Sequence, residues 1–216
     1  MNNDFDRVVL VDKPSGMSSF GVVARVRARL RDEAGYKIKV GHTGTLDPFA
    51  TGLLVLLSGK YTRRSNEFLK LDKEYEATIS LGFTSSTGDP EGDLTRVSDI
   101  CPTKKEVETV LKNLVGELKQ TPPIYSAIKI NGQRAYKLAR AGKAPEMPER
   151  VVKIYQLELM DYNYPLLKVR AKVSSGTYIR SLAEQIGEIL GAGAYCSELR
   201  RTQIGQYHVR DANIKL

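Results

Sequence analysis

One carboxylate stands out as a group that could do chemistry. Asp47 lies in the segment 39–52, which is rich in glycine, threonine and other turn-forming residues, and it directly precedes Pro48. Glycines let a substrate approach a loop closely, and a rigid turn would hold the carboxylate still. Asp47 could therefore act as a nucleophile or a base, although the pattern also suits an ordinary turn aspartate. His42, on the same loop, is by itself more typical of a structural or surface histidine than of a catalytic one.

Several common catalytic motifs are absent from the sequence. There is no HExxH, no G-x-S-x-G and no G-x-G-x-x-G, and Cys101 and Cys196 lack the CxxC spacing of a metal site. Gly52 and the pair Gly59-Lys60 suggest a phosphate loop, but six residues separate the two glycines instead of four, and Tyr61 replaces the required serine or threonine. We therefore expect no bound metal and no nucleotide cofactor.

The charge balance favours a polyanionic partner. The 216 residues contain 33 Lys and Arg against 25 Asp and Glu, so the net charge is +8. This balance suits nucleic acid, an anionic membrane surface or a phosphorylated substrate, and it also occurs in proteins without such partners. No apolar run could span a membrane, and the acidic N-terminus does not resemble a signal peptide. We expect a cytoplasmic protein with reduced cysteines.

The elements that must position Asp47 can be predicted from local patterns. Residues 8–12 predict a short buried strand, and Ser18 or Ser19 should cap a helix that runs to about residue 33. The apolar run 52–58 suits a buried strand or a core helix, and residues 61–71 fit a helix. Residues 74–81 alternate cleanly, which predicts a strand, and residues 88–93 predict a turn.

The second half of the chain adds more helices and strands. Thr103 and Glu106 have the spacing of a capping box that begins a helix. Residues 121–148, with four prolines and a basic helix candidate at 133–141, predict a mobile or inserted segment. Strands are predicted at 151–160 and 166–174, and an amphipathic helix at 177–190. Because strands and helices do not alternate strictly, we expect an α+β fold with a mixed, mainly antiparallel central sheet flanked by helices.

Six ordered blocks of sequence resemble those of one protein family. They are Asp12-Lys13-Pro14-Ser15-Gly16-Met17-Ser18-Ser19; Gly41-His42-Thr43-Gly44-Thr45-Leu46-Asp47-Pro48 with Ala50-Thr51-Gly52-Leu53-Leu54; Lys73-Glu74-Tyr75; Pro122-Pro123-Ile124-Tyr125-Ser126-Ala127 with Gly132-Gln133-Arg134-Ala135-Tyr136; Gly176-Thr177-Tyr178-Ile179-Arg180-Ser181-Leu182; and Leu199-Arg200-Arg201. In this order they are similar to the motifs of the TruB family of tRNA pseudouridine synthases. The set is far more specific than any single block.

The resemblance implies a fold, an activity and a partner. The family has the pseudouridine synthase fold and converts uridine 55 in the T arm of tRNA to pseudouridine, with no metal or organic cofactor. It implies one catalytic domain over residues 1–216, in which 121–148 is an RNA-clamping insertion. Longer members carry a C-terminal RNA-binding domain, often of the PUA type, which we do not expect in this chain. A monomer is the default expectation.

The resemblance also assigns roles to individual residues. Asp47 would be the catalytic carboxylate, Tyr75 would stack on the target base and join the later proton chemistry, and Arg180 would pair with the aspartate. Tyr178 and Leu199 would line the pocket, and His42 would help to hold the RNA with its base flipped out. The candidate phosphate contacts are Lys13, Arg63, Arg134, Lys137, Arg140, Arg200 and Arg201.

The chemistry explains why these residue types are needed. Pseudouridylation breaks the bond between N1 and C1′, turns the uracil and rejoins it through C5. A carboxylate can attack C1′, remove a proton at C2′ or add to C6, and the sequence does not choose among these routes. A neighbouring Arg180 would keep Asp47 ionised in a dry pocket. The alternatives are an exposed Arg180–Glu184 pair, and core packing for Tyr75.

Two other functions fit the same blocks. The chain could bind or fold RNA with the same clamp but without chemistry, although the intact set of Asp47, Tyr75 and Arg180 argues against this. It could also be a synthase that acts on another RNA stem-loop with the shape of a T arm.

Overall fold

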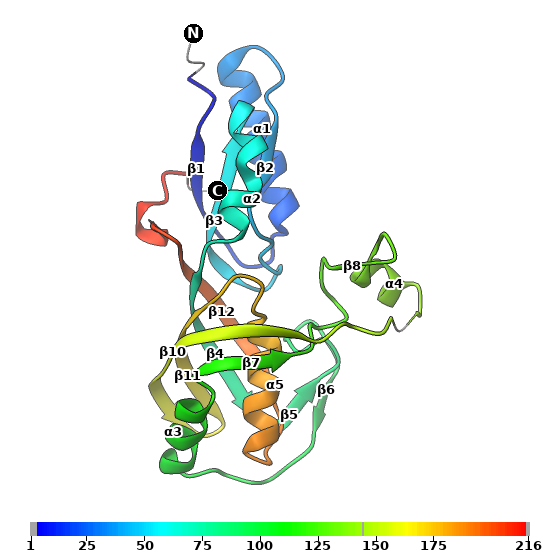
Figure 1. The fold of residues 1–216 in the computed structure, drawn as a ribbon, viewed down its shortest axis with the longest axis vertical. Coiled ribbons are helices and arrows are strands. Elements are labelled where there is room, and N and C mark those ends of the chain that lie inside the picture. Colours follow the sequence, from blue (N-terminus) through cyan, green and yellow to red (C-terminus); the bar gives the residue numbers. More distant parts are fainter. Residues whose placement is uncertain (1–3, 144, 215–216) are drawn as a thin grey trace. The chain divides into compact units, whose positions relative to one another are not determined.

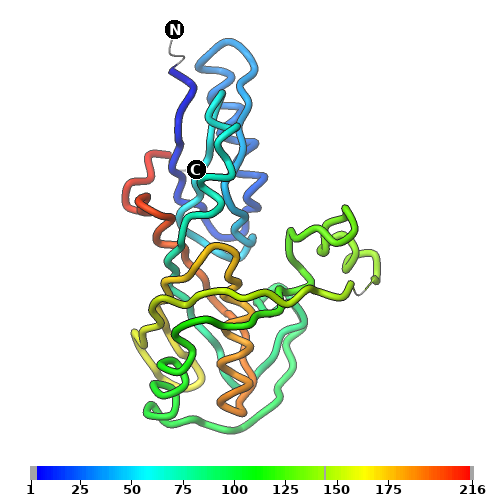
Figure 2. The backbone as a smooth tube through the Cα atoms, in the orientation of Figure 1, coloured from blue at the N-terminus to red at the C-terminus, as the bar shows by residue number. Residues whose placement is uncertain are grey.

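A computed structural model of the chain describes residues 4–143 and 145–214. The chain divides into two compact units, one formed by Met1–Tyr75 with Leu199–Leu216 and the other by Glu76–Glu198. Both units combine strands with helices, as Figures 1 and 2 show. Within the described residues, no helix is long and apolar enough to cross a membrane.

The first unit is built around the apolar strand β3 (Thr51–Ser58). β1 (Val8–Lys13) and β2 (Val40–His42) pair with it antiparallel, and β12 (Ala194–Ile204) pairs with it in parallel at Arg200 and Arg201. The hairpin strand β13 (Tyr207–His208) follows on β12, before the 3₁₀ turn η2 (Val209–Asp211). Residues 52–58 are all buried, which explains why their sequence shows no alternation, and they form a strand and not a core helix.

The helices of the first unit follow local sequence signals. α1 (Ser19–Ala34) is capped by the Ser18 side chain, which accepts from the backbone N–H of Gly21, and it ends at Gly35 with φ of +77°. Its buried stripe of valines and Leu30 packs on β1 and β3. Residues 61–71 are not one helix: they form a 3₁₀ turn η1 (Gly59–Arg64) and a short α2 (Ser65–Leu69).

The second unit holds a mainly antiparallel sheet in the order β12-β4-β11-β10-β7. Its strands besides β12 are β4 (Lys73–Leu81), which begins in the first unit, β11 (Leu166–Val173), β10 (Arg150–Asn163) and β7 (Gly116–Gln120). The unit also contains the helices α3 (Lys104–Asn113) and α5 (Ile179–Ile189), and a small hairpin is formed by β5 (Phe83–Ser85) and β6 (Leu94–Arg96). The capping box of Thr103 and Glu106 is present as predicted.

The predicted insertion leaves and rejoins this sheet at neighbouring points. It runs from the end of β7 to the start of β10 and contains β8 (Lys129–Ile130), β9 (Gln133–Arg134) and α4 (Ala135–Arg140). Figure 2 shows the tube of this segment projecting away from the sheet strands of its own unit. Its two ends are register partners, because Gln120 lies opposite Arg150 in the β7–β10 ladder.

The backbones of β3 and β12 approach each other closely at Gly52. It has φ of +103°, and a Cβ there would lie 2.3 Å from the backbone oxygen of Arg201. Because that oxygen belongs to a paired strand and cannot move freely, Gly52→Ala should destabilise the protein by at least about 2 kcal/mol in urea denaturation. Gly41→Ala is the matched control, since no atom lies within 4 Å of its added Cβ. Equal stability of the two variants would contradict this packing.

Candidate functional site

The loop that carries Asp47 is held on one side by the segment that precedes α1. Lys13 is completely buried, and its ammonium donates to the backbone oxygens of Pro14, Met17 and Pro48 at 2.7–3.0 Å. The Ser19 hydroxyl both donates to the oxygen and accepts from the N–H of Leu46, each at 2.8 Å. The residues on both sides of Asp47 are therefore fixed by backbone hydrogen bonds, while the Asp47 side chain itself is half-buried.

Arg201 holds the other side of the same loop. Only 1% of it is exposed, and its guanidinium donates to the backbone oxygens of Leu53, Gly44 and Thr45. Since these bonds reach both the loop and β3, Arg201 fixes the loop against the strand that follows it. The arrangement presents a partly exposed carboxylate on a backbone that is held at several points, as a catalytic group requires.

The structure differs from the sequence prediction for Lys13 and Arg201. Both were expected to contact phosphates, but both are buried and direct their donors at backbone oxygens of the Asp47 loop. Such side chains position the loop and do not present a charge to a ligand. Arg200, the neighbour of Arg201, is half-exposed and forms a bidentate pair with Asp12 at 2.7 and 3.1 Å. Adjacent residues of a strand face opposite sides, which accounts for the difference.

The remaining predicted residues of the first unit lie in three different environments. Tyr75 and Leu199 are buried, with 8% and 7% exposed. His42 is half-buried on β2, and its Nδ1 accepts from the backbone N–H of Gly44 at 3.4 Å. Arg63 is exposed on η1 and is free to reach a phosphate if one approaches.

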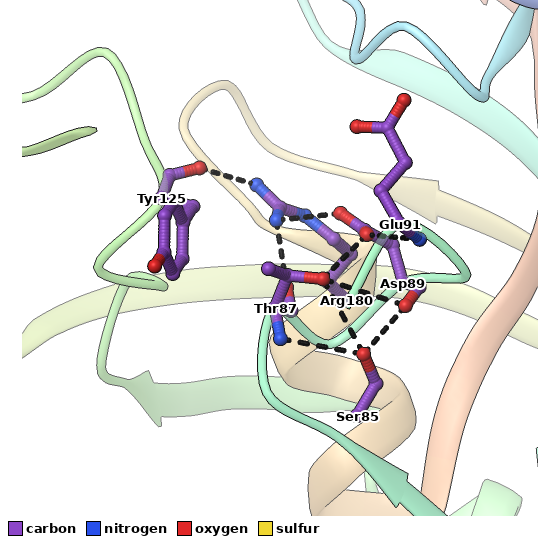
Figure 3. Close-up of polar contacts among 6 residues, drawn as sticks. All are labelled: Ser85, Thr87, Asp89, Glu91, Tyr125 and Arg180. Atoms are coloured by element: carbon purple, nitrogen blue, oxygen red, sulfur yellow. Dashed lines mark hydrogen bonds and ion pairs between the residues drawn. The ribbon is translucent and has the colours of Figure 1, made fainter. Parts of the chain in front are cut away.

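Arg180 is the most constrained cation of the second unit (Figure 3). It is 2% exposed, and its Nη1 donates to a carboxylate oxygen of Asp89 at 2.9 Å and to the backbone oxygen of Thr87 at 2.8 Å. Its Nη2 donates to the backbone oxygen of Tyr125, also at 2.8 Å. The alternative of an exposed Arg180–Glu184 pair is therefore wrong, because Arg180 is buried and bonded to Asp89.

Asp89 is the functional candidate that the sequence analysis missed. Residues 88–93 do form a turn, but Asp89 is only 3% exposed and also accepts from the Thr87 hydroxyl and the Glu91 backbone N–H. These bonds satisfy the carboxylate that faces Arg180. An aspartate next to proline in a turn gives no sequence sign that it is buried. The one available signal was Arg180, because a buried arginine requires a buried carboxylate as its partner.

Glu184 is a second acid near this pair. Burial raises the pKa of its carboxyl, with Asp89 acting in the same direction and Arg180 opposing. A Cβ at Gly88 would lie 2.6 Å from a Glu184 carboxylate oxygen, so the turn and the helix pack tightly here. The other predicted residues of this unit are Tyr178, half-buried at the start of α5, and three exposed cations of the insertion, Arg134, Lys137 and Arg140.

The pairing of Asp47 with Arg180 stays a prediction. Asp47 belongs to the first unit and Arg180 to the second, and each unit is described by itself.

Lys73, in the Lys73-Glu74-Tyr75 block, is a fourth buried cation. It is 7% exposed and donates to the backbone oxygens of Leu69 and Leu71. Burial, aided by the charge of Arg201, lowers its pKa from the ordinary 10.5 to about 8.

The chain matches known protein families and is similar in sequence to known proteins. A model of the TruB family pseudouridylate synthase (N terminal domain) matches residues 31–179, and one of the tRNA pseudouridylate synthase B C-terminal domain matches residues 180–216. The chain is 45% identical over 207 residues to tRNA pseudouridine synthase B of Francisella philomiragia, covering 95% of this chain and 67% of the relative. The corresponding protein of Pseudomonas fluorescens is 45% identical over 200 residues, with 93% and 64% covered.

Solved structures give the same fold. The crystal structure of a Cbf5-Nop10-Gar1 complex matches with a TM-score of 0.70 and 32% identity, covering 94% of this chain and 51% of that one. An H/ACA RNP bound to a substrate RNA containing 2′-deoxyuridine matches with a TM-score of 0.67 and 30% identity, covering 93% and 48%. The chain thus spans about two thirds of the length of the curated relatives and about half of the solved chains.

The Asp89–Arg180 pair should be important for stability. Asp89→Ala removes a buried counter-charge, which typically costs about 3–5 kcal/mol, and urea denaturation should show a loss of this size. Asp99→Ala is the control, since its pair with Arg96 is mostly exposed and should contribute no more than about 1 kcal/mol. If both variants lose equally little, Asp89 is not the partner that stabilises Arg180.

Lys73 should give the protein a specific dependence on pH. Between pH 8 and 10.5 the folded state binds fewer protons at Lys73 than the unfolded state, so this group makes stability rise with pH. The free energy of unfolding of the wild type should therefore improve relative to Lys73→Met from pH 8 to 10.5, measured by urea denaturation at each pH. A constant difference between the two proteins would refute the lowered pKa.

Proposed function

Because the chain belongs to the TruB family of pseudouridylate synthases, we propose that it isomerises uridine 55 in the T arm of tRNA to pseudouridine, with Asp47 as the catalytic carboxylate. The observation that carries the proposal is the Asp47 loop. Its backbone is held by Lys13 and Ser19 on one side and by Arg201 on the other, while Asp47 itself is only half-buried. A loop that only reverses the chain does not need three buried side chains to hold it.

The reaction explains why the carboxylate must be held still. The N1–C1′ bond of the target nucleotide breaks, the uracil turns, and C5 forms the new bond to C1′ while the C5 proton leaves to solvent. The base stays in the site throughout, and because the C5 proton leaves while N1 takes up a proton from solvent, the product is an isomer of the starting nucleotide. A carboxylate that acts at the sugar or the ring has to keep its place while the base turns, and a preorganised loop supplies this.

The other site residues would hold the flipped nucleotide and its surroundings. Tyr75 would stack on the target base, which can contribute about 1–3 kcal/mol toward the cost of unstacking. Tyr178 and Leu199 would line the pocket, and His42 would support the RNA from which the base has left. Arg180 would face Asp47 and favour its ionised form, while Asp89 keeps the guanidinium in place.

The exposed cations would grip the RNA. Arg63 on η1, the half-exposed Arg200, and Arg134 with Lys137 and Arg140 on the insertion are the proposed phosphate contacts. Lys13 and Arg201 take a positioning role instead. The proposal treats the chain as one catalytic domain that carries 121–148 as its RNA-binding insertion, and it needs no cofactor. It also includes a monomer acting in the cytoplasm, a compartment that suits Cys101 and Cys196, neither of which forms a disulfide.

Tritium release from C5-labelled uridine in unmodified tRNA tests this proposal. The wild type should release tritium, and Asp47→Asn should lower the rate at least about a thousand-fold while it still binds tRNA. Asp32→Asn, which removes one exposed carboxylate on α1, should retain the wild-type rate. Activity retained by Asp47→Asn would refute the catalytic role of this residue.

The choice of RNA separates the proposal from its alternatives. A T-arm hairpin should react and unrelated stem-loops should not. Binding of tRNA by a wild type that releases no tritium would instead indicate an RNA-binding or RNA-folding protein. Reaction with unrelated stem-loops would indicate a synthase for another RNA.

A further inference from the structure

The two ends of the insertion both contact Tyr178. Gln120, the last residue of β7, is 1% exposed, and its Oε1 accepts from the Tyr178 backbone N–H at 2.8 Å. Arg150, its register partner at the start of β10, places its guanidinium 4.8 Å from the centre of the Tyr178 ring and donates to the backbone oxygen of Gly176. We call Gln120 and Arg150 the insertion stem.

The start of α5 depends on this stem because it has no cap of its own. Tyr178 is the N-cap residue of α5, it makes no side-chain capping bond, and the first turn contains no acidic residue. Gln120 therefore does for the Tyr178 N–H what the glutamate of a capping box does in other helices. The Gln120 Nε2 has no hydrogen-bond partner among the described residues, so its bond to α5 is made by the oxygen alone.

Further bonds join the same two segments next to Arg180. The Ser181 hydroxyl donates to the Thr121 oxygen at 2.9 Å, and Arg180 donates to the Tyr125 oxygen. The next carbonyl, that of Ser126, accepts from the backbone N–H of Tyr136 on α4. The helix of the insertion and the buried arginine are thus bonded to adjacent carbonyls of one segment.

We propose that Gln120 is a positioning residue, which couples the grip of the insertion on RNA to the placement of Tyr178 and Arg180. RNA held by the exposed cations Arg134, Lys137 and Arg140 orders the insertion, and the stem passes this order to the first turn of α5. The proposal rests on the proposed function, since it concerns how that site is assembled. Gln120 itself is too deeply buried to touch the substrate.

Gln120→Met tests the role of the oxygen, because the side chain keeps its size but cannot accept from Tyr178. With enzyme in excess over unmodified tRNA, the single-turnover rate of pseudouridine formation should fall about ten-fold, the effect of one lost hydrogen bond in the transition state. The affinity for tRNA should stay the same. Gln120→Glu keeps an acceptor opposite Arg150 and should restore most of the rate.

Gln185→Met is the matched control. Gln185 also joins α5 to the end of β7, since its Nε2 donates to the Lys119 oxygen, but it contacts neither Tyr178 nor Arg180 in the described hydrogen bonds. Its removal should leave the single-turnover rate unchanged. Equal losses in Gln120→Met and Gln185→Met, or no rescue by Gln120→Glu, would reduce Gln120 to a structural residue and overturn the proposal.

Hydrogen exchange at the Tyr178 amide gives a readout that does not require activity. In the wild type a T-arm hairpin should slow this exchange, and in Gln120→Met exchange should be faster and insensitive to the hairpin. Equal exchange in the two proteins overturns the coupling, whereas a wild type that forms no pseudouridine overturns the proposed function. If Gln120→Met does not fold, Arg150→Met takes its place, because Arg150 contacts the Tyr178 ring and is itself only half-buried. This variant should show the same loss of single-turnover rate and the same faster exchange at the Tyr178 amide.

Discussion

Buried cations bonded to backbone oxygens are the interaction on which the candidate site depends. Lys13 and Arg201 hold the Asp47 loop, Lys73 holds the turn before β4, and Arg180 holds the segments that contain Thr87 and Tyr125. Removing such a charge from water costs several kcal/mol unless oxygens replace the lost hydration. The irregular segments around each cation supply these oxygens. Each segment is held in place because its backbone oxygens replace the water that the buried charge has lost.

This requirement has a direct consequence for catalysis. A loop without regular pairing is normally among the more mobile parts of a protein, yet a catalytic carboxylate must keep its place to within a fraction of an ångström. Lys13 and Arg201 resolve this conflict, because the oxygens that they bind belong to residues on both sides of Asp47. The cationic residues thus divide into two groups: buried ones position the site, and exposed ones such as Arg63 and Arg134 remain available to the RNA.

The sequence predicted local elements well and the burial of charges poorly. Caps and periodicity are encoded within a few residues, so α1 with its Ser18 cap and α3 with its Thr103 box were confirmed. The helix expected at 61–71 was not, because the 3₁₀ turn η1 occupies its start and the α-helix covers only Ser65–Leu69. Asp89 and Arg201 were misjudged because the charge or oxygens that compensate them come from segments distant in sequence, and for Lys13 one of the three oxygens, that of Pro48, is distant as well. For Arg201 a signal did exist: it alternates on β12 with Arg200, so only one of the two can face the core.

The helices also differ in whether their N-terminal caps come from nearby or from distant residues. α1 and α3 are capped by residues of their own chain segment, and their formation needs little from the rest of the fold. α5, which carries Arg180, receives its cap from Gln120 on β7 and packs its first turn against residues 121–125. Its first turn is therefore bonded to the end of β7 and to the base of the insertion, and not only to its own segment. For the proposed function, a helix end of this kind would suit Arg180, because the order of the RNA-binding insertion and the order of this arginine would then be a single equilibrium.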